Sequence, residues 1–175
     1  MTSPLDRNSM RYIRHMNIRM ATEADFDPLL RLINTAFDVE RFFKDEDRLD
    51  NAKLKEYFKK GDFLVIEEDG QLAAAVYVER KGDRSYLGLL SVDPRQQRRG
   101  LGRRLTAAAE EFAREMGARF MDLTVVNLRT ELPPIYENLG YRMTGTAPFP
   151  ADQMPVTQAC HFICMTKELG HRPGA

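Results

Sequence analysis

Hydrophobic and polar residues change their spacing along this chain, and these changes divide it into short elements. Alternation over 17–21 predicts a strand. Apolar residues at helical spacing then predict a helix that begins at Thr22, with Asp25 completing a capping box. A more charged stretch predicts a second helix over 47–59, which ends at Gly61. The first third of the chain is therefore expected to form one strand and two helices.

Three apolar strands follow, over 63–67, 71–80 and 85–92, separated by short turns that contain glycine. Such short turns predict an antiparallel meander. The spacing becomes helical again over 100–116, and the nearly continuous apolar run 120–126 predicts a strand buried on both faces. A strand, a helix and a strand in this order predict a parallel pair joined by a crossover.

A short helix over 132–139 and two last strands, near 141–146 and 160–167, complete the pattern. We expect an α/β fold (mixed α+β): one central mixed sheet of about six to seven strands, flanked on its faces by about four helices. The expected organisation is a flexible N-terminal arm, one folded domain and a disordered tail, over residues 1–16, 17–168 and 169–175.

Composition narrows the classes of function. The 175 residues contain 26 Lys+Arg and 26 Asp+Glu, so nothing attracts the whole chain to nucleic acid or an acidic membrane. The apolar runs are too short to span a bilayer, and the N-terminus lacks a secretory apolar core. Alternation places His161 on the opposite strand face from Cys160 and Cys164, so we expect no metal site. A cytoplasmic protein without nucleic-acid or membrane partners is expected.

One stretch carries most of the candidate chemistry. The strand ending at Val92-Asp93-Pro94 leads into a polar loop, and Gly100 and Gly102 stand at the start of the next helix. A helix N-terminus presents unpaired N–H groups, and glycines let a phosphate approach them closely. Leu105 replaces the third glycine of a dinucleotide fingerprint, and no Walker A lysine is present. Five arginines add local positive charge: Arg95, Arg98, Arg99, Arg103 and Arg104. The loop therefore predicts a pyrophosphate site, and the alternative is a plain tight turn.

These residues resemble the signature loop of the GCN5-related N-acetyltransferases (GNAT), which here would be Gln97-Arg98-Arg99-Gly100-Leu101-Gly102 after Val92-Asp93-Pro94. A second family signature, a tyrosine in a late helix before a glycine–aromatic pair, is matched by Tyr136-Glu137-Asn138-Leu139-Gly140-Tyr141. The resemblance extends over about residues 17–168. It implies a GNAT-like acyl-CoA N-acyltransferase fold and transfer of the acetyl group of acetyl-CoA to a primary amine.

The resemblance also implies roles for individual residues. The pantetheine arm of acetyl-CoA would pair with the backbone of Leu90, Ser91 and Val92. Backbone N–H groups would hold the pyrophosphate, from residues Gln97, Arg98, Arg99, Gly100, Leu101, Gly102 and Arg103. Asn127 would stand at the mouth of a slot between parallel strands, and Tyr136 would donate a proton to the departing thiolate. The alternatives are a turn residue for Asn127 and a packed core tyrosine for Tyr136.

Two features depart from the family pattern. Asn127 and Tyr136 are farther apart than is usual, and the extra residues include Pro133-Pro134, so the helix is expected to start near Pro134. The strand before the loop has no carboxylate to serve as a general base. By elimination, Glu131 is expected to meet the substrate amine and to accept its proton, and the alternatives are Glu79 or ordered water leading to a more distant carboxylate.

The leading hypothesis is direct attack by an amine on acetyl-CoA, with Tyr136 as general acid. The alternative is a catalytically silent acyl-CoA-binding sensor or regulatory module of the same fold. A nucleic-acid-binding domain that uses the arginines is disfavoured by the zero net charge. The acceptor stays open between small-molecule and peptide amines, and a homodimer is possible. In the family, the segment between the first two helices often shapes the acceptor pocket, although its aromatic residues are expected in the core: Phe37, Phe42, Phe43, Tyr57 and Phe58.

Overall fold

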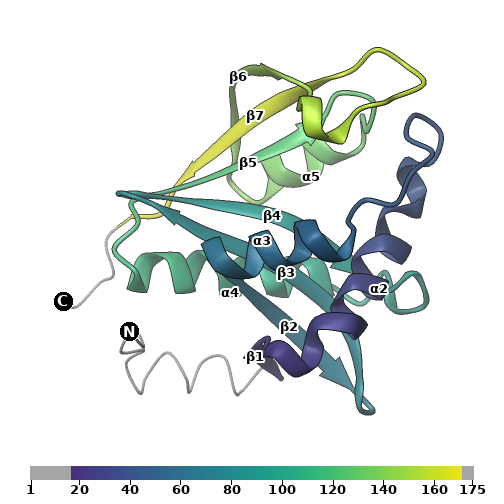
Figure 1. Ribbon diagram of the computed structural model, residues 1–175. Coiled ribbons are helices and arrows are strands. Elements are labelled where there is room, and N and C mark those ends of the chain that lie inside the picture. The colour runs from purple at the N-terminus through teal and green to yellow at the C-terminus, as the bar shows by residue number, and fades with distance from the viewer. Residues whose placement is uncertain (1–16, 171–175) are drawn as a thin grey trace.

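The computed structural model describes residues 17–170 and builds them around one seven-stranded sheet in the order β1-β2-β3-β4-β5-β7-β6 (Figure 1). All neighbouring strands are antiparallel except β4 and β5, which are parallel. The expected mixed sheet, meander and parallel pair are confirmed. The strands are β1 (Ile18–Met20), β2 (Asp62–Glu68), β3 (Gln71–Lys81), β4 (Arg84–Val92), β5 (Phe120–Val126), β6 (Arg142–Pro148) and β7 (His161–Glu168).

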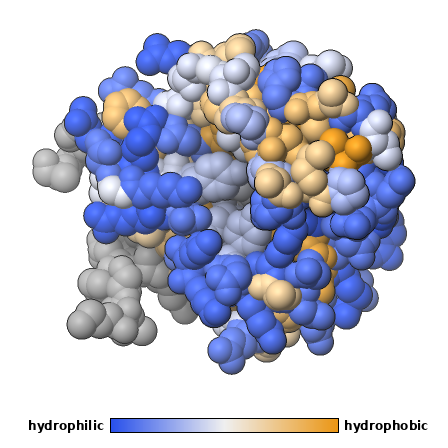
Figure 2. All heavy atoms as spheres, turned by 45° about the horizontal axis from the view of Figure 1, so that its top comes forward, coloured by the Kyte–Doolittle hydropathy of each residue, from blue (hydrophilic) through white to orange (hydrophobic). Residues whose placement is uncertain are grey.

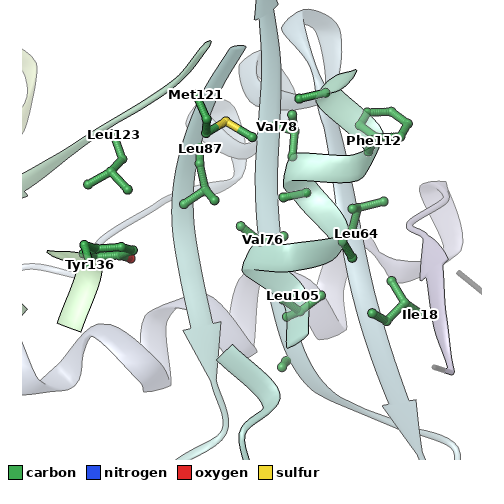
Figure 3. Packing of buried hydrophobic residues seen from close by; sticks show 14 of the residues in the cluster. Ile18, Leu64, Val76, Val78, Leu87, Leu105, Phe112, Met121, Leu123 and Tyr136 are labelled. Carbon is green, nitrogen blue, oxygen red and sulfur yellow. The ribbon is translucent and has the colours of Figure 1, made fainter. Parts of the chain in front are cut away.

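Two hydrophobic clusters, one on each face of the sheet, hold the helices in place. Successive residues of β2 alternate between the clusters, as a strand requires: Leu64 packs with α4, and Val65 packs with α2. Figure 3 shows Leu105 and Phe112 of α4 against the strand residues on their side of the sheet. The α-helices of the described residues are α2 (Phe26–Phe37), α3 (Asn51–Lys60), α4 (Leu101–Glu115) and α5 (Leu132–Asn138).

Three element boundaries differ from the expectations. The second helix begins at Asn51 rather than near residue 47, because the Asp50 side chain accepts from Lys53 N at 2.7 Å and caps it. Helix α5 begins at Leu132 instead of near Pro134. Both prolines fit in its first turn, where backbone N–H groups have no helical partner to lose. The capping box of Thr22 and Asp25 is present, on a 3-10 turn that precedes α2.

Two expectations about burial are wrong. Strand β5 is less buried on one face than on the other: Met121 and Leu123 are buried, whereas Asp122 and Thr124 are half-buried and only Val126 is buried on their face. The reason is that α2 packs mainly over β3 and β4. Leu169, expected to begin the disordered tail, is buried, and its N–H donates to Arg119 O at 2.9 Å. The predicted arm over 1–16 and the last five residues lie outside the described residues.

The parallel strands β4 and β5 pair over only three residues and then diverge (Figure 1). Arg84 of β4 donates to both carboxylate oxygens of Asp122 of β5, at 2.5 and 2.6 Å, and ties this end together. Farther along, Leu89 has a φ of 49° and the register of β4 against β3 shifts. Such a β-bulge bends the strand. The pairing of β4 with β5 ends at Tyr86, just before this bulge.

Candidate active site

A cavity of about 290 Å³ lies where β4 and β5 diverge. Its lining comes from both hydrophobic clusters, so the cavity crosses the sheet from one face to the other. On the α4 side the lining includes Leu90, Leu123, Val125 and Tyr136. On the α2 side it includes Phe37, Tyr57, Tyr86 and Leu89. Two molecules that enter from opposite faces can therefore meet between the strands.

The end of β4 offers free backbone groups to this gap. Asp93 N donates to Ala73 O of β3, and Ser91 is paired with Ala75 of β3. Because successive residues of a strand direct their N–H and C=O groups to opposite sides, Leu90 and Val92 direct theirs toward β5. The resemblance assigned this segment to the pantetheine arm. Ser91 itself is buried and its hydroxyl donates to Leu89 O, so its side chain is used within the strand.

The loop from Gln97 to Arg103 has the backbone of an anion site. Arg98 and Gly100 have φ values of 64° and 73°, and alternating left-handed residues turn neighbouring N–H groups to one side. The first hydrogen bond of α4 runs from Arg104 N to Gly100 O, which leaves the earlier N–H groups at the open helix end. No acidic residue occupies the first turn of α4. These features fit a pyrophosphate.

The arginines of this loop are not equivalent. Arg95 pairs with Asp93 at 2.8 Å and Arg99 pairs with Glu68 at 2.5 Å, so both charges are compensated. Within the described residues, Arg98 and Arg103 are exposed and make no ion pair. These two guanidinium groups remain available for phosphate, so the local positive charge is smaller than the number of arginines suggests.

Tyr136 lies on α5 with only 7% of its surface exposed, and it lines the cavity. Its ring projects beside Leu123, with the hydroxyl oxygen on the side of β4 (Figure 3). Burial raises the pKa of Tyr136 to about 12, so the hydroxyl keeps its proton at neutral pH. Within the described residues the hydroxyl makes no hydrogen bond, and it is therefore free to donate one to a substrate.

A buried polar cluster holds the ring of Tyr136 in place. Tyr141 packs edge-on against it, with ring centroids 5.7 Å apart. The Tyr141 hydroxyl donates to Glu110 Oε1 at 3.0 Å, and Lys167 Nζ donates to Glu110 Oε2 at 2.8 Å. Because Glu110 is only 5% exposed, these two partners offset the cost of burying its charge. The cluster fixes the end of α5 against α4 and β7.

Asn127 is tied to a neighbouring strand. Its N–H donates to His161 O at 2.9 Å, and its side-chain oxygen accepts from His161 N at 2.8 Å. The side chain thus extends the β5–β7 ladder by one step. Asn127 is not part of the cavity lining, so the geometry favours the turn-residue alternative.

The three candidate carboxylates occupy different places. Glu131 is half exposed, does not line the cavity and accepts from Arg129 Nε at 2.6 Å. Burial raises the pKa of Glu131, but the hydrogen bond from Arg129 outweighs this effect and leaves the pKa below its ordinary value. Glu79 accepts from the Tyr77 hydroxyl at 2.9 Å and also lies outside this cavity. Neither side chain reaches the gap between β4 and β5.

Glu40 is the carboxylate that lines the cavity. Its side chain is 13% exposed, and burial raises its pKa above the ordinary value despite the nearby charges of Arg48 and Arg129. Arg129 Nη1 lies 3.3 Å from Glu40 Oε1. A carboxylate with a raised pKa is a better proton acceptor than an ordinary one. The sequence analysis missed this residue, because no local motif marks a glutamate that meets its partner 89 positions later.

The connection between α2 and α3 closes one end of the cavity together with the loop before β7. Lys44 is buried and donates to Gln153 O at 2.9 Å, and Thr157 N donates to Phe43 O at 2.8 Å. Phe43 is in the core as expected, whereas Phe42 is 49% exposed. Figure 2 shows apolar side chains gathered on part of this face of the molecule. The implied role of this segment in shaping an acceptor pocket agrees with its position.

A larger cavity of about 540 Å³ lies between α2 and the turn that joins β2 to β3. Its carboxylates are already engaged: Arg19 lies 2.7 Å from both Asp25 and Glu67. Because these ion pairs leave little free chemistry, we place the candidate active site in the smaller cavity.

Residues 17–170 contain no helix that is long and apolar enough to cross a membrane. The same residues contain no group of three or more His, Cys, Asp or Glu side chains placed to hold a metal ion.

Known proteins resemble this chain in sequence and in structure. A family model for the acetyltransferase (GNAT) domain matches residues 35–159. Streptothricin acetyltransferase of Streptomyces lavendulae is 33% identical over 85 residues, which are 47% of this chain and 45% of that relative. The matched part thus spans just under half of the relative's length.

Two solved structures show the shared fold. The ribosomal-protein-S18-alanine N-acetyltransferase of Escherichia coli gives a TM-score of 0.71 at 17% identity, covering 90% of this chain and 96% of that one. A Salmonella typhimurium protein solved with its cofactor acetyl-CoA gives a TM-score of 0.69 at 21% identity, covering 90% and 95%.

Proposed function

This chain belongs to the GNAT family of acetyl-CoA-dependent N-acetyltransferases, and we propose that it transfers the acetyl group directly to an amine held between β4 and β5. The observation that carries the proposal is the buried Tyr136 hydroxyl, which lines a cavity reached from both faces of the sheet. Acetyl-CoA would enter from the α4 side and the amine from the α2 side.

The donor side of the proposal rests on two backbone features. The free N–H groups of the loop from Gln97 to Arg103 suit the pyrophosphate, and Arg98 and Arg103 supply uncompensated charge. The backbone of Leu90 and Val92 faces the gap and suits the amide groups of the pantetheine arm. A Cβ atom added at Gly102 would lie 3.7 Å from both Leu90 and Val92, so this glycine stands where loop and strand meet.

In the proposed reaction, the amine nitrogen forms a bond to the acetyl carbonyl carbon while the carbon–sulfur bond breaks. Tyr136 donates to the departing sulfur. Because an ordinary thiol has a pKa near 8.5, full proton transfer from a tyrosine with a pKa of about 12 is uphill. The hydroxyl therefore acts first as a hydrogen-bond donor to the developing negative charge. The proton lost by the nitrogen balances the one gained by the sulfur.

We assign the proton acceptor to Glu40 in preference to Glu131. Glu40 lines the cavity and has a raised pKa, whereas Glu131 lies outside the cavity and has a lowered one. Arg129 lies between the two carboxylates and acts as a positioning residue for Glu40. We assign Asn127 a structural role, since its side-chain oxygen accepts a hydrogen bond from His161 N of β7.

The acceptor is proposed to be a small-molecule or peptide amine. The streptothricin acetyltransferase match covers too little of either chain to carry its acceptor over. A cytoplasmic location agrees with the free thiols of Cys160 and Cys164. A homodimer remains a prediction.

Acetyl-CoA binding by calorimetry and thiol release with a panel of amines test this proposal. The expected result is binding with 1:1 stoichiometry, together with amine-dependent thiol release and an acetylated product of the expected mass. Binding without thiol release from any amine would instead support the silent sensor. Absence of binding would contradict the whole proposal.

A further inference from the structure

The α2 side of the active-site cavity has an excess of positive charge. A second hollow of about 390 Å³ continues it, and the two share Arg48, Tyr57, Tyr86 and Gln153. Cations outnumber carboxylates in each lining. The cations of the two hollows are Arg48, Arg129, Lys53, Lys60 and Lys81. The carboxylates are Glu40, Glu56, Glu79 and Asp152. An acceptor that enters here therefore meets a net positive surface.

Most of these cations are already engaged. Arg129 is held between Glu40 at 3.3 Å and Glu131 at 2.6 Å. Lys53 donates to Asp152 O at 2.6 Å, and Lys81 lies 3.8 Å from Glu79. Arg48 differs from them, because it lines both hollows and makes no ion pair within the described residues.

Arg48 is also held in a defined position. It is half-buried, and its guanidinium carbon lies 5.4 Å from the centre of the Phe37 ring. A guanidinium over an aromatic face keeps its edge free, and that edge matches the two oxygens of a carboxylate. Glu40 lies close enough to sense the charge of Arg48 but forms no ion pair with it, so a ligand that contacts the guanidinium with the opposite charge is favoured.

The surroundings of Arg48 suit the rest of a small ligand. Tyr57 and Tyr86 connect the two hollows, and Phe149 and Phe162 add apolar surface to the inner one. Glu40 lines the same inner hollow and can meet an ammonium group. A group for a carboxylate, a group for an ammonium and apolar rings thus line one cavity, and together they match the groups of an amino acid.

We propose that the acceptor is a small amine that bears a carboxylate, of the type of an amino acid with an apolar side chain, and that Arg48 binds this carboxylate. The inference rests on the proposed acetyl transfer and specifies its substrate class. Polyamines and other polycations are disfavoured, because the net positive lining would repel them.

The test compares matched acceptors in wild type and in Arg48→Gln. L-leucine and L-phenylalanine are paired with their amides, which keep the amine and the side chain but lose the carboxylate. The ratio of kcat/KM for acid over amide is measured for each enzyme by thiol release. Comparing this ratio between the two enzymes cancels the different amine pKa values of the acids and the amides. We expect the ratio to fall at least about tenfold in Arg48→Gln, since a charge-assisted pair is lost.

Two variants control the measurement. Arg48→Lys keeps the charge without the planar fork and is expected to recover part of the ratio. Lys55→Gln removes one positive charge from an exposed position on α3 that lines neither hollow, and it should leave the ratio unchanged.

Several results would overturn the inference alone. They are an acid-to-amide ratio that Arg48→Gln does not change, a wild-type preference for spermidine or for a peptide N-terminus, and thiol release with none of the carboxylate-bearing amines. In each case acetyl-CoA still binds. Failure of acetyl-CoA to bind would instead contradict the proposed function itself, so the two failures can be told apart.

Discussion

The two ends of the β4–β5 pair are built on opposite principles. At one end, Arg84, Asp122 and Thr166 connect β4, β5 and β7 through charge-assisted hydrogen bonds of 2.5 to 2.6 Å. At the other end, the bulge at Leu89 turns β4 away and a cavity takes the place of the ladder. The same two strands are thus closed by side chains at one end and opened by the backbone at the other.

This difference separates stability from chemistry. At the closed end, the side chains of Arg84, Asp122 and Thr166 are hydrogen-bonded to one another. The open end carries unpaired backbone groups and the free Tyr136 hydroxyl, which we expect to gain partners when substrates bind, and it carries Glu40, which is held by Arg129. Changes at the open end should therefore alter catalysis with little effect on folding, and changes at the closed end should do the reverse.

The largest effect is expected at the donor entrance. Gly102→Val adds a branched side chain beside Leu90 and Val92 and blocks close approach to the N–H groups at the start of α4. Losing two charge-assisted hydrogen bonds should weaken acetyl-CoA binding by about 100-fold in calorimetry. Gly102 is a cleaner test than Gly100, where the φ of 73° would strain a valine. Ala107→Val, at an exposed position of α4, controls for the lower helix propensity. Unchanged affinity in Gly102→Val would place the pyrophosphate elsewhere.

Tyr136→Phe is expected to slow the chemical step by roughly 10-fold or more, because the departing sulfur loses its hydrogen-bond donor. Acetyl-CoA affinity should stay the same. Single-turnover rates make the comparison, since product release can limit steady-state turnover. Tyr86→Phe is the matched control, since Tyr86 also lines the cavity but its hydroxyl already contacts Thr124 Oγ1 at 3.3 Å. Equal losses in both variants would contradict a specific role for Tyr136.

The pH dependence of catalysis distinguishes Glu40 from Glu131. A raised pKa means that Glu40 becomes an effective base only as the pH rises through a value above its ordinary range. Wild-type kcat/KM should therefore decline as the pH falls through that value. Glu40→Gln should remove this decline and lower kcat/KM by up to about 10-fold, since water can replace part of the function. Glu131→Gln is expected to keep the wild-type profile, and the opposite pattern would restore Glu131 as the base.

The smallest effect on activity is expected at the closed end. Asp122→Asn should leave kcat unchanged and lower the free energy of unfolding by about 1 kcal/mol. This loss is smaller than for a buried ion pair, because the side chains of Arg84 and Asp122 are about one-third exposed and solvent screens their charges. Although burial raises the pKa of Asp122, hydrogen bonds from Arg84 and Thr166 hold it below its ordinary value. Its stabilising effect is therefore present at pH 7 and disappears as the pH falls below about 4.

Urea denaturation at pH 7 and at pH 3.5 measures both parts of this prediction. Glu168→Gln changes an exposed carboxylate of β7 and serves as the control. A loss of activity in Asp122→Asn without a loss of stability would contradict the division between the two ends.

Much of the fold could be predicted from local patterns. The alternation in β2 and β3 and the apolar stripe of α4 follow from which face each side chain must bury, and the structure confirms both. Gly100 and Gly102 could be assigned to an anion loop because a helix N-terminus needs no distant partner to present its N–H groups. The sequence pattern did not identify Asp50 as the N-cap, and for this reason α3 begins at Asn51 and not near residue 47.

The bulge at Leu89 gave only a weak signal, the glycine beside it at position 88. The presence of the bulge depends both on the pairing of β4 with β3 on one side and on its divergence from β5 on the other. Glu40 and Arg48 gave no signal at all, because an isolated charge in a polar loop looks the same whether it faces water or a cavity.

By itself, the sequence determined the order of the elements and the mixed sheet, and it predicted the anion loop at the start of α4 and the role of Tyr136. Each depends on residues close together in the chain, whose spacing fixes hydrogen bonding and burial locally. Only the tertiary structure decided which carboxylate lines the cavity, that Asn127 belongs to the β5–β7 ladder, and that Arg48 is left without an ion pair. These depend on contacts between distant segments, and the free energy of a buried charge is set by the groups that packing brings around it.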